Sequence, residues 1–390
     1  MRFVHKSLLM PAVVAGLLII GLEFGPSLKA QQPAGSIWQI QHPPFSKTIG
    51  LELNAISAQS DQNVWAVGNG SAHWNGSSWS YVPIVRHDSL NLSGVAAISP
   101  TNVWAVGVFI NSQGRPVEAV EQFDGQAWHV IPDVSLIGKD LQGIVVSETL
   151  TSISALAAND IWAAGYIGIQ PPCDCIVPFV EHFDGTQWKL SAVLLTANSP
   201  GNFQFMQGIS AISDSDVWAV GYESLNGALN GAAQIFHFDG VQWILTTSPS
   251  GPTARFDGIT AIANKDIWAV GQNNQQTLTA HFDGAQWKVV RSPDTKDLTN
   301  VLYGVSSVSG TSVWAVGQHS PAFGLSKALV LHFDGAAWSI TPAPSQDGSD
   351  STVLFAASSL PSGHVWLAGT FVSLQHPPLR PFVLFTDRGF

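Results

Sequence analysis

A pentapeptide built around tryptophan recurs through the chain and constrains its fold more than any other feature. The seven copies are VWAVG at 64–68 and 103–107, IWAAG at 161–165, VWAVG at 217–221, IWAVG at 267–271, VWAVG at 313–317 and VWLAG at 365–369. A second segment follows six of them, as HWNGSSW at 73–79, QFDGQAW at 122–128, HFDGTQW at 182–188, HFDGVQW at 237–243, HFDGAQW at 281–287 and HFDGAAW at 332–338. Two motifs recurring in a fixed order are typical of a protein built from repeats, in which each unit completes the core of its neighbours.

Both motifs indicate β-strands. The pentapeptide is short, apolar and bounded by turn residues, which favours a strand with both faces covered. A glycine stands ten residues before the pentapeptide tryptophan in several repeats, as at Gly208 and Gly258, and this spacing indicates a preceding strand and a tight turn. The Asp-Gly pair predicts a hairpin with positive φ at both central positions. Each repeat therefore supplies four antiparallel strands, and we predict an all-β, seven-bladed β-propeller. A β-solenoid is the less favoured alternative, because its repeats are shorter and more uniform.

The seventh repeat lacks its fourth strand, because the chain ends at 381–390 without a second tryptophan. A matching segment lies at the other end of the chain. Residues 36–40, followed by Pro43, resemble residues 337–340, followed by Pro342. We therefore predict that the N-terminal strand, at about 36–42, completes the C-terminal blade and closes the ring.

The N-terminus has the pattern of an export signal. Arg2 and Lys6 precede an apolar run from Leu8 to Leu22, and a small residue, Ala30, offers a cleavage site. That run is short for a spanning helix. We predict a signal peptide at 1–30 and a single mature domain at 31–390, exported as a secreted or cell-envelope protein, with an uncleaved anchor as the alternative.

Charge and cysteine content restrict the partners. The chain has 16 basic and 27 acidic residues and a net charge of −11, which disfavours nucleic acid and anionic membrane surfaces. Cys173 and Cys175 are the only cysteines, so the chain can form no more than one internal disulfide. We expect this local bridge across a single residue, because export favours oxidation. The histidine of the second motif recurs once per repeat, which indicates a structural role. We therefore predict no metal and no cofactor, and we expect a monomer.

Length variation locates the predicted site. It is confined to the connections from the second to the third strand and from the fourth strand to the next repeat, and these emerge on one face. The residues after the seven pentapeptides are Asn69, Val108, Tyr166, Tyr222, Gln272, Gln318 and Thr370, and those at the matching point of the preceding strands are Asn54, Ser93, Thr151, Gln207, Asp257, Tyr303 and Phe355. Three of the four tyrosines fall in these two rings. We predict a ligand site formed by Tyr166, Tyr222, Tyr303, Asp257, Gln272, Gln318 and Arg255. Amphipathic aromatic, amide and guanidinium groups suit a carbohydrate or protein ligand, although the exposed faces of propellers are commonly polar.

No nucleophile elbow, zinc-protease motif or phosphate loop occurs in the sequence. A non-catalytic binding module is therefore the leading hypothesis. A polysaccharide hydrolase or lyase remains an alternative, because Glu148 and Glu223 are expected in loops of the same face and Asp257 nearby. A purely structural surface or assembly protein is the third hypothesis.

The repeats resemble those of bacterial exported propeller proteins that carry VWAVG and H-[FW]-[DN]-G-x-x-W motifs, over about residues 36–390. This resemblance implies the fold and no particular activity. The segment FDGxxW is also similar to the Asp-box of sialidases and photosystem II stability factors, which has one more residue between Asp and Gly. Residues 363–370 resemble the propeller repeats of two-component sensors.

Overall fold

The computed structural model describes residues 37–44, 52–85, 89–194, 202–225, 231–322, 324–344, 351–372 and 380–386. The predicted signal peptide at 1–30 lies outside them. The regular structure of the described residues is entirely β, with strands β1 to β28 and no helix. Within these ranges no helix has the length and hydropathy needed to cross a bilayer.

Four strands recur in each repeat, at the places where the two motifs predict them. The first strands are β2 (Leu53–Ser60), β6 (Leu90–Ser99), β10 (Val145–Ala157), β14 (Asn202–Ser213), β18 (Ala254–Ala263), β22 (Thr299–Ser309) and β26 (Ser351–Ser359). The second strands carry the pentapeptide: β3 (Asn63–Gly68), β7 (Asn102–Ile110), β11 (Asp160–Ile169), β15 (Asp216–Leu225), β19 (Asp266–Asn273), β23 (Ser312–Ser320) and β27 (Val365–Val372). The third strands are β4 (Ser71–Trp74), β8 (Pro116–Phe123), β12 (Cys175–Phe183), β16 (Ala232–Phe238), β20 (Gln276–Phe282), β24 (Lys327–Phe333) and β28 (Arg380–Thr386). The fourth strands are β5 (Trp79–Val82), β9 (Trp128–Val130), β13 (Trp188–Val193), β17 (Trp243–Thr246), β21 (Trp287–Val289) and β25 (Trp338–Ile340), and β1 (Trp38–Gln41) pairs with β28.

The strands form antiparallel sheets of four, except that two such groups are joined into one larger sheet. A single parallel bridge between Ile176 and Phe203 links β12 to β14, and so joins β10–β13 to β14–β17. In the sheet that contains both ends of the described chain, the order is β1-β28-β27-β26, with Trp38 opposite Thr386.

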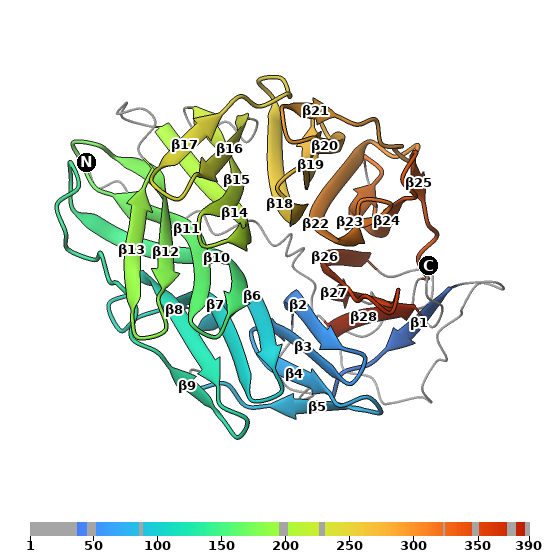
Figure 1. Ribbon diagram of the computed structural model, residues 1–390, viewed down its shortest axis with the longest axis horizontal. Helices are drawn as coiled ribbons and strands as arrows, with labels where there is room; N and C mark the ends of the chain where they lie inside the picture. Colours follow the sequence, from blue (N-terminus) through green and yellow to red (C-terminus); the bar gives the residue numbers. More distant parts are fainter. Residues whose placement is uncertain are drawn as a thin grey trace, which may run out of the picture.

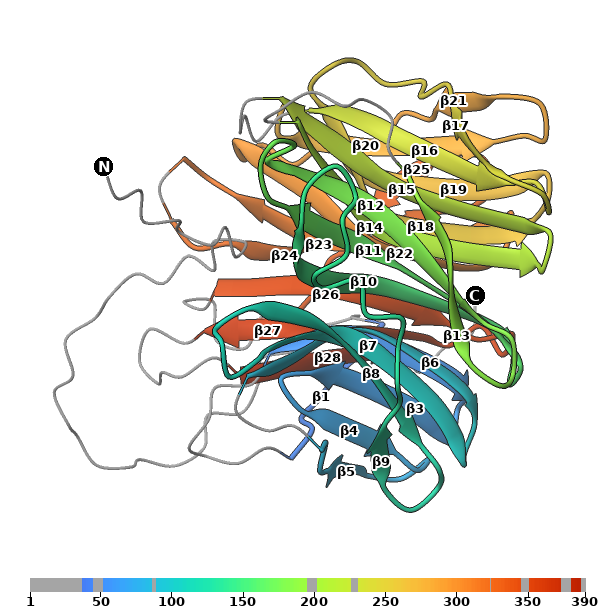
Figure 2. The same cartoon turned by 90° about the vertical axis from the view of Figure 1, so that its left-hand side faces the viewer.

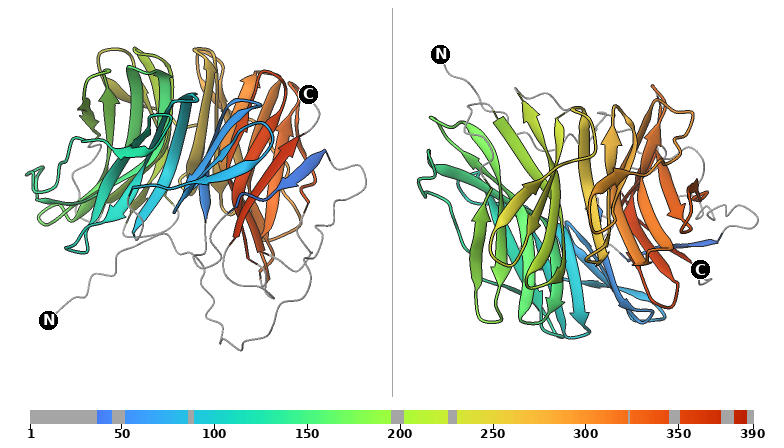
Figure 3. Two further views of the ribbon diagram at one scale, coloured as in Figure 1. Left: turned by 90° about the horizontal axis from the view of Figure 1, so that it is seen from below. Right: turned by 45° about the horizontal axis from the view of Figure 1, so that its top comes forward.

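The sheets stand side by side around a common centre, with the first strand of each innermost (Figure 1). Each innermost strand contacts the next one in the chain, and β26 contacts β2. Seen from other sides, neighbouring sheets pack face to face (Figures 2 and 3). The innermost strands therefore bring residues from every repeat close to the centre.

Tryptophans from neighbouring sheets pack against one another to form the core. Trp65, from a pentapeptide, lies 5.5 Å from Trp128 of the next sheet in an edge-to-face contact, and Trp314 lies 5.4 Å from Trp38 in the same arrangement. Thirteen of the fifteen tryptophans are buried, and only Trp74 and Trp243 are partly exposed. The tryptophans of the two motifs therefore form much of the core between the sheets.

The histidine of the second motif stacks on the pentapeptide tryptophan in the five repeats that carry it. The His182 imidazole stacks on Trp162, and both rings bond to one carboxylate oxygen of Asp160, at 2.8 Å from His182 Nε2 and 3.1 Å from Trp162 Nε1. In the Asp-Gly turn only the glycine has a positive φ, +98° at Gly125. Asp124 instead accepts two backbone N–H groups of the turn, so the prediction of positive φ at both positions is wrong.

Candidate functional site

Every innermost strand carries a β-bulge at the same point. The residues that the register skips there are Asn54, Ser93, Thr151, Gln207, Asp257, Tyr303 and Phe355. A bulged residue has no partner across the strand pair, and the bulge redirects its side chain. These seven residues are the inner ring that the glycine spacing identifies in the sequence.

Glycines beside the bulges let neighbouring innermost strands approach closely. A Cβ added at Gly258 would lie 2.8 Å from the carbonyl oxygen of Tyr303, and one added at Gly304 would lie 2.6 Å from that of Phe355. Both contacts are too short for any side chain at these positions. The bulges of β18, β22 and β26 therefore lie next to one another, which brings Asp257, Tyr303 and Phe355 into one neighbourhood.

Arg255 and Asp257 form the polar centre of this region. Both lie on β18, and Arg255 Nε donates a 3.0 Å hydrogen bond to Asp257 Oδ2. The Arg255 guanidinium also lies over the Tyr222 ring, with its Cζ 5.7 Å from the ring centroid. The side chain of Asp257 is 5% exposed and that of Arg255 is 17% exposed, so solvent reaches mainly the arginine.

Aromatic side chains extend on both sides of this pair. Phe205 stacks on Tyr222 at 5.1 Å and meets Tyr166 edge-on at 5.0 Å. On the other side, Tyr303 lies 5.7 Å from Phe355. We name Tyr166, Phe205, Tyr222, Arg255, Asp257, Tyr303 and Phe355 the inner-strand cluster.

The two predicted glutamines, Gln272 and Gln318, lie on the second strands β19 and β23, which pair with β18 and β22. Gln318 Nε2 donates to the Tyr303 hydroxyl at 3.1 Å. Gln272 is the cross-strand neighbour of Arg255. The seven residues predicted from the sequence thus occupy six neighbouring strands of the third to sixth repeats.

Phe205 is the contact residue that the sequence prediction missed. It stands two positions before the bulge residue Gln207, as Arg255 stands two positions before Asp257. Aligning the repeats at that position as well would have identified it.

Burial sets the protonation of the cluster. It raises the pKa of Asp257 to about 6, although Arg255 acts in the opposite direction. Burial also raises the pKa of Tyr222 and of Tyr303 to about 12, so both stay neutral hydroxyls. Burial opposes the charge of Arg255, but Asp257 and the two tyrosines raise its pKa above the usual value. At neutral pH the arginine and the aspartate are both charged, and slightly acidic pH protonates the aspartate.

The carboxylates considered for catalysis do not lie where the sequence placed them. Glu148 is not in a loop but inside β10, fully buried, where it accepts the backbone N–H of Leu136. Glu223 is also within a strand, β15, opposite Gln204. The expectation that both belong to loops is therefore wrong. The strand β10 begins earlier than the motif spacing suggests, and this places Glu148 among the core residues.

Buried glutamates gather elsewhere, between the sheets of the second and third repeats. They are Glu118 on β8, Glu148 on β10 and Glu181 on β12, and all three are buried. Each points to the face of its strand that also carries hydrophobic core residues. Among the described residues, the carboxylate oxygens of Glu118 and Glu181 have no hydrogen-bond partner. Burial, together with the neighbouring carboxylates, raises the pKa of Glu118 to about 11 and that of Glu181 to about 9. Across the residues that the structure describes, no three His, Cys, Asp or Glu side chains are grouped to hold a metal ion.

Cys173 and Cys175 are joined by a disulfide, with their Cα atoms 5.2 Å apart. The bridge lies where the chain enters β12, and Cys175 packs into the core of the third repeat. Since Cys175 starts a strand, the bridge ties the connecting loop to the sheet.

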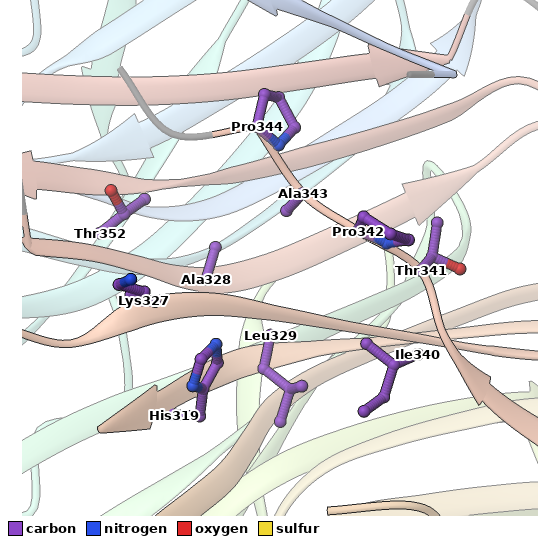
Figure 4. Close-up of a pocket in the computed structure, with 10 residues that line it drawn as sticks. All are labelled: His319, Lys327, Ala328, Leu329, Ile340, Thr341, Pro342, Ala343, Pro344 and Thr352. Atoms are coloured by element: carbon purple, nitrogen blue, oxygen red, sulfur yellow. The ribbon is translucent and has the colours of Figure 1, made fainter. Parts of the chain in front are cut away.

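A pocket of about 280 Å³ lies beside β24 and β25 (Figure 4). His319, Leu329 and Ile340 lie on one side of β24, whereas Ala328 lies on the other. In agreement, Leu329 packs toward the fifth repeat and Ala328 toward the seventh. The polar groups of this pocket do not converge, and none of the predicted site residues lines it.

Comparison with solved structures identifies the fold. The chain is similar to YCF48 bound to D1 peptide, with a TM-score of 0.55 and 14% identity over 93% of this chain and 99% of that chain. It is also similar to the WD40 β-propeller domain of Doa1 (TM-score 0.56, 10% identity, 90% and 97% covered) and to the RRP9 WD40 repeats (TM-score 0.58, 8% identity, 93% and 100% covered). No protein-family model and no curated protein matches the chain. At these identities the likeness shows a β-propeller fold and nothing of its ligand.

Proposed function

We propose that this protein is an exported, non-catalytic binding propeller whose ligand lies over the inner-strand cluster. The observation that carries the proposal is the cluster itself. Bulges at one position of successive strands bring Asp257 and Tyr303 close together, and Arg255 links Asp257 to the Tyr222 ring in a connected, partly exposed group. Function in rigid repeat folds is commonly carried by such surfaces next to variable loops.

The proposed architecture has seven blades, closed by β1 as the fourth strand of the last blade. The pairing of β1 with β28 and the contact of β26 with β2 support this closure. Residues 1–30 are proposed as the export signal. A mature N-terminus near residue 31 in protein recovered outside the cytoplasm would support this assignment, and an intact Met1 would contradict it.

A carbohydrate suits the inner-strand cluster better than a protein partner. Protein interfaces have an apolar, desolvated centre. In the described part of the chain, none of the exposed large hydrophobic side chains belongs to this cluster: they are Tyr81, Val85, Ile110, Ile144, Leu156, Leu190, Val241, Ile244, Leu245, Val289, Leu298 and Ile340. The cluster supplies instead aromatic rings, tyrosine hydroxyls, one carboxyl and one guanidinium, with the amides of Gln272 and Gln318 beside it, and these are groups that bind sugars. The D1 peptide is a ligand of YCF48, and at 14% identity it is no guide to the ligand of this chain.

The test is retention on immobilised polysaccharides and cell-wall polymers, with released sugars measured in the same samples. We expect retention without product, and loss of retention in the variant Tyr222→Ala/Tyr303→Ala. Tyr81→Ala is the matched control, because Tyr81 is 43% exposed on β5, away from the cluster. Melting curves of both variants separate lost binding from lost folding. Release of sugar would contradict the non-catalytic proposal, and retention unchanged by the double substitution would place the site elsewhere.

A further inference from the structure

The Arg255 guanidinium has bonding capacity that the protein does not use. Its Nε donates a hydrogen bond to Asp257, but the described residues offer no hydrogen-bond partner to its two terminal nitrogens. The guanidinium lies over the face of the Tyr222 ring, a cation–π contact that favours this placement of the group. An arginine held in this way offers two parallel N–H donors, the arrangement that binds a carboxylate through both oxygens.

The charges around Asp257 decide what can bind there. Arg255 faces it from its own strand, Tyr222 from β15 and Tyr303 from β22, and both tyrosines are neutral. With Asp257 ionised, the pair has no net charge, and the chain as a whole carries −11. With Asp257 protonated, the pair carries one positive charge. An anionic ligand group is therefore favoured at this point only when the aspartate is neutral.

We propose that the ligand of this site is a carboxylate-bearing carbohydrate, whose uronate group binds the terminal nitrogens of Arg255 while Asp257 takes up one proton from solvent. This inference rests on the proposed function and specifies its ligand class. A ligand carboxylate close to Asp257 disfavours a second negative charge on that aspartate. Ligand binding therefore favours protonation of Asp257, and protonation of Asp257 favours ligand binding. Because the pKa of Asp257 is about 6 before binding, the affinity falls as pH rises above that value.

Isothermal calorimetry with trigalacturonate and its neutral methyl ester tests the inference. We expect trigalacturonate to bind about 20-fold more tightly at pH 5.5 than at pH 7.5, as one linked proton requires. Heats measured in buffers of different ionisation enthalpy should show uptake of nearly one proton per ligand at pH 7.5. The methyl ester should bind more weakly and without this pH dependence.

Two substitutions separate the roles of the pair. Asp257→Asn keeps the shape of the side chain without the charge, and should bind trigalacturonate at pH 7.5 as tightly as the unchanged protein does at pH 5.5. Arg255→Gln should remove the preference for the acid over the ester. Tyr81→Ala should alter neither property.

The outcomes distinguish this inference from the proposed function. Equal binding of acid and ester, both sensitive to Tyr222→Ala, would overturn the uronate inference and leave the binding site in place. Retention of neutral polysaccharides alone would have the same meaning. Failure of every sugar to bind would overturn both. Binding of trigalacturonate without proton uptake would contradict the role given to Asp257.

Discussion

At the scale of single residues, the fold depends on one acceptor shared by two rings. Asp266 accepts hydrogen bonds from Trp268 Nε1 at 3.1 Å and from His281 Nε2 at 2.8 Å. The first repeat uses Asn63 in this place, which shows that an amide oxygen serves as well. The recurring histidine thus holds the carboxylate or amide oxygen in place to accept the N–H of the buried tryptophan. This role explains why most repeats carry the histidine.

The shared acceptor predicts a graded effect of substitution. Asp266→Ala leaves the indole N–H of Trp268, which is 2% exposed, without a partner, and we expect it to lower the free energy of unfolding by about 1–3 kcal/mol. Asp266→Asn keeps the acceptor and should lower it by less than half as much. Urea unfolding followed by tryptophan fluorescence measures both. Equal losses for the two variants would show that charge, and not the acceptor, is what matters.

Residue spacing predicts such local groups but not those that form between sheets. The position of Tyr303 follows from the spacing of Gly304 to the pentapeptide. Glu118 on β8 and Glu181 on β12 belong to different sheets, and Glu181 acts on the pKa of Glu118. The packing of one sheet on the next decides this placement, and no local pattern encodes it. Phe205, in contrast, lies directly across from Tyr222 in the β14–β15 pair, so an alignment of the repeats at that position would have identified it.

At the scale of strands and sheets, the motifs predict where each strand lies because strand, turn and hairpin signals are local. They fail where strands are irregular. The strand β10 reaches back to Val145 through a bulge, so Glu148 is within it. The bridge from Ile176 to Phe203 joins two sheets in parallel, and no motif marks either residue.

The buried glutamates between the second and third sheets predict an unusual pH dependence. Burial and the neighbouring carboxylates raise the pKa of Glu118 to about 11 in the folded chain, whereas the ordinary pKa of 4.5 applies in the unfolded chain. The folded state therefore binds a proton that the unfolded state releases above about pH 5. Since stability falls with pH wherever the folded state binds more protons, each such proton lowers it by about 1.4 kcal/mol per pH unit.

We expect the urea midpoint to fall from pH 5 to pH 9, and Glu118→Gln to make that fall shallower. The glutamine mimics the neutral acid, so the variant should be more stable than the unchanged protein at pH 9. Glu223→Gln, on β15, is the control and should leave the slope as it is. If the urea midpoints of all three proteins fell with pH at the same slope, Glu118 would not be the source of the pH dependence.

At the scale of the whole molecule, the proposed closure of the ring depends on the N-terminal strand β1. Trp38 on β1 is fully buried and packs edge-on against Trp314 of the sixth repeat. This is the arrangement that Trp287 makes with Trp218 inside the chain, at 5.7 Å. The N-terminal strand thus supplies the contact that the fourth strand supplies in the other repeats.

The closure model predicts that Trp38→Ala destabilises the molecule at least as much as Trp287→Ala. Removing a buried tryptophan costs about 3–5 kcal/mol, and here the loss also frees a chain end. Thermal unfolding and limited proteolysis of the two variants provide the comparison. A melting temperature unchanged by Trp38→Ala would show that β1 is dispensable and that the ring does not depend on it.

The central claim is that ligands lie over the inner-strand cluster, and hydrogen–deuterium exchange with a retained polysaccharide tests it most directly. The account predicts slower exchange in the peptides of β15, β18 and β22, which carry Tyr222, Arg255 with Asp257, and Tyr303. Exchange in β5, β17 and β21 at the outer edges of their sheets should stay the same. Protection confined to those outer strands would contradict the account and place the ligand on the rim of the molecule.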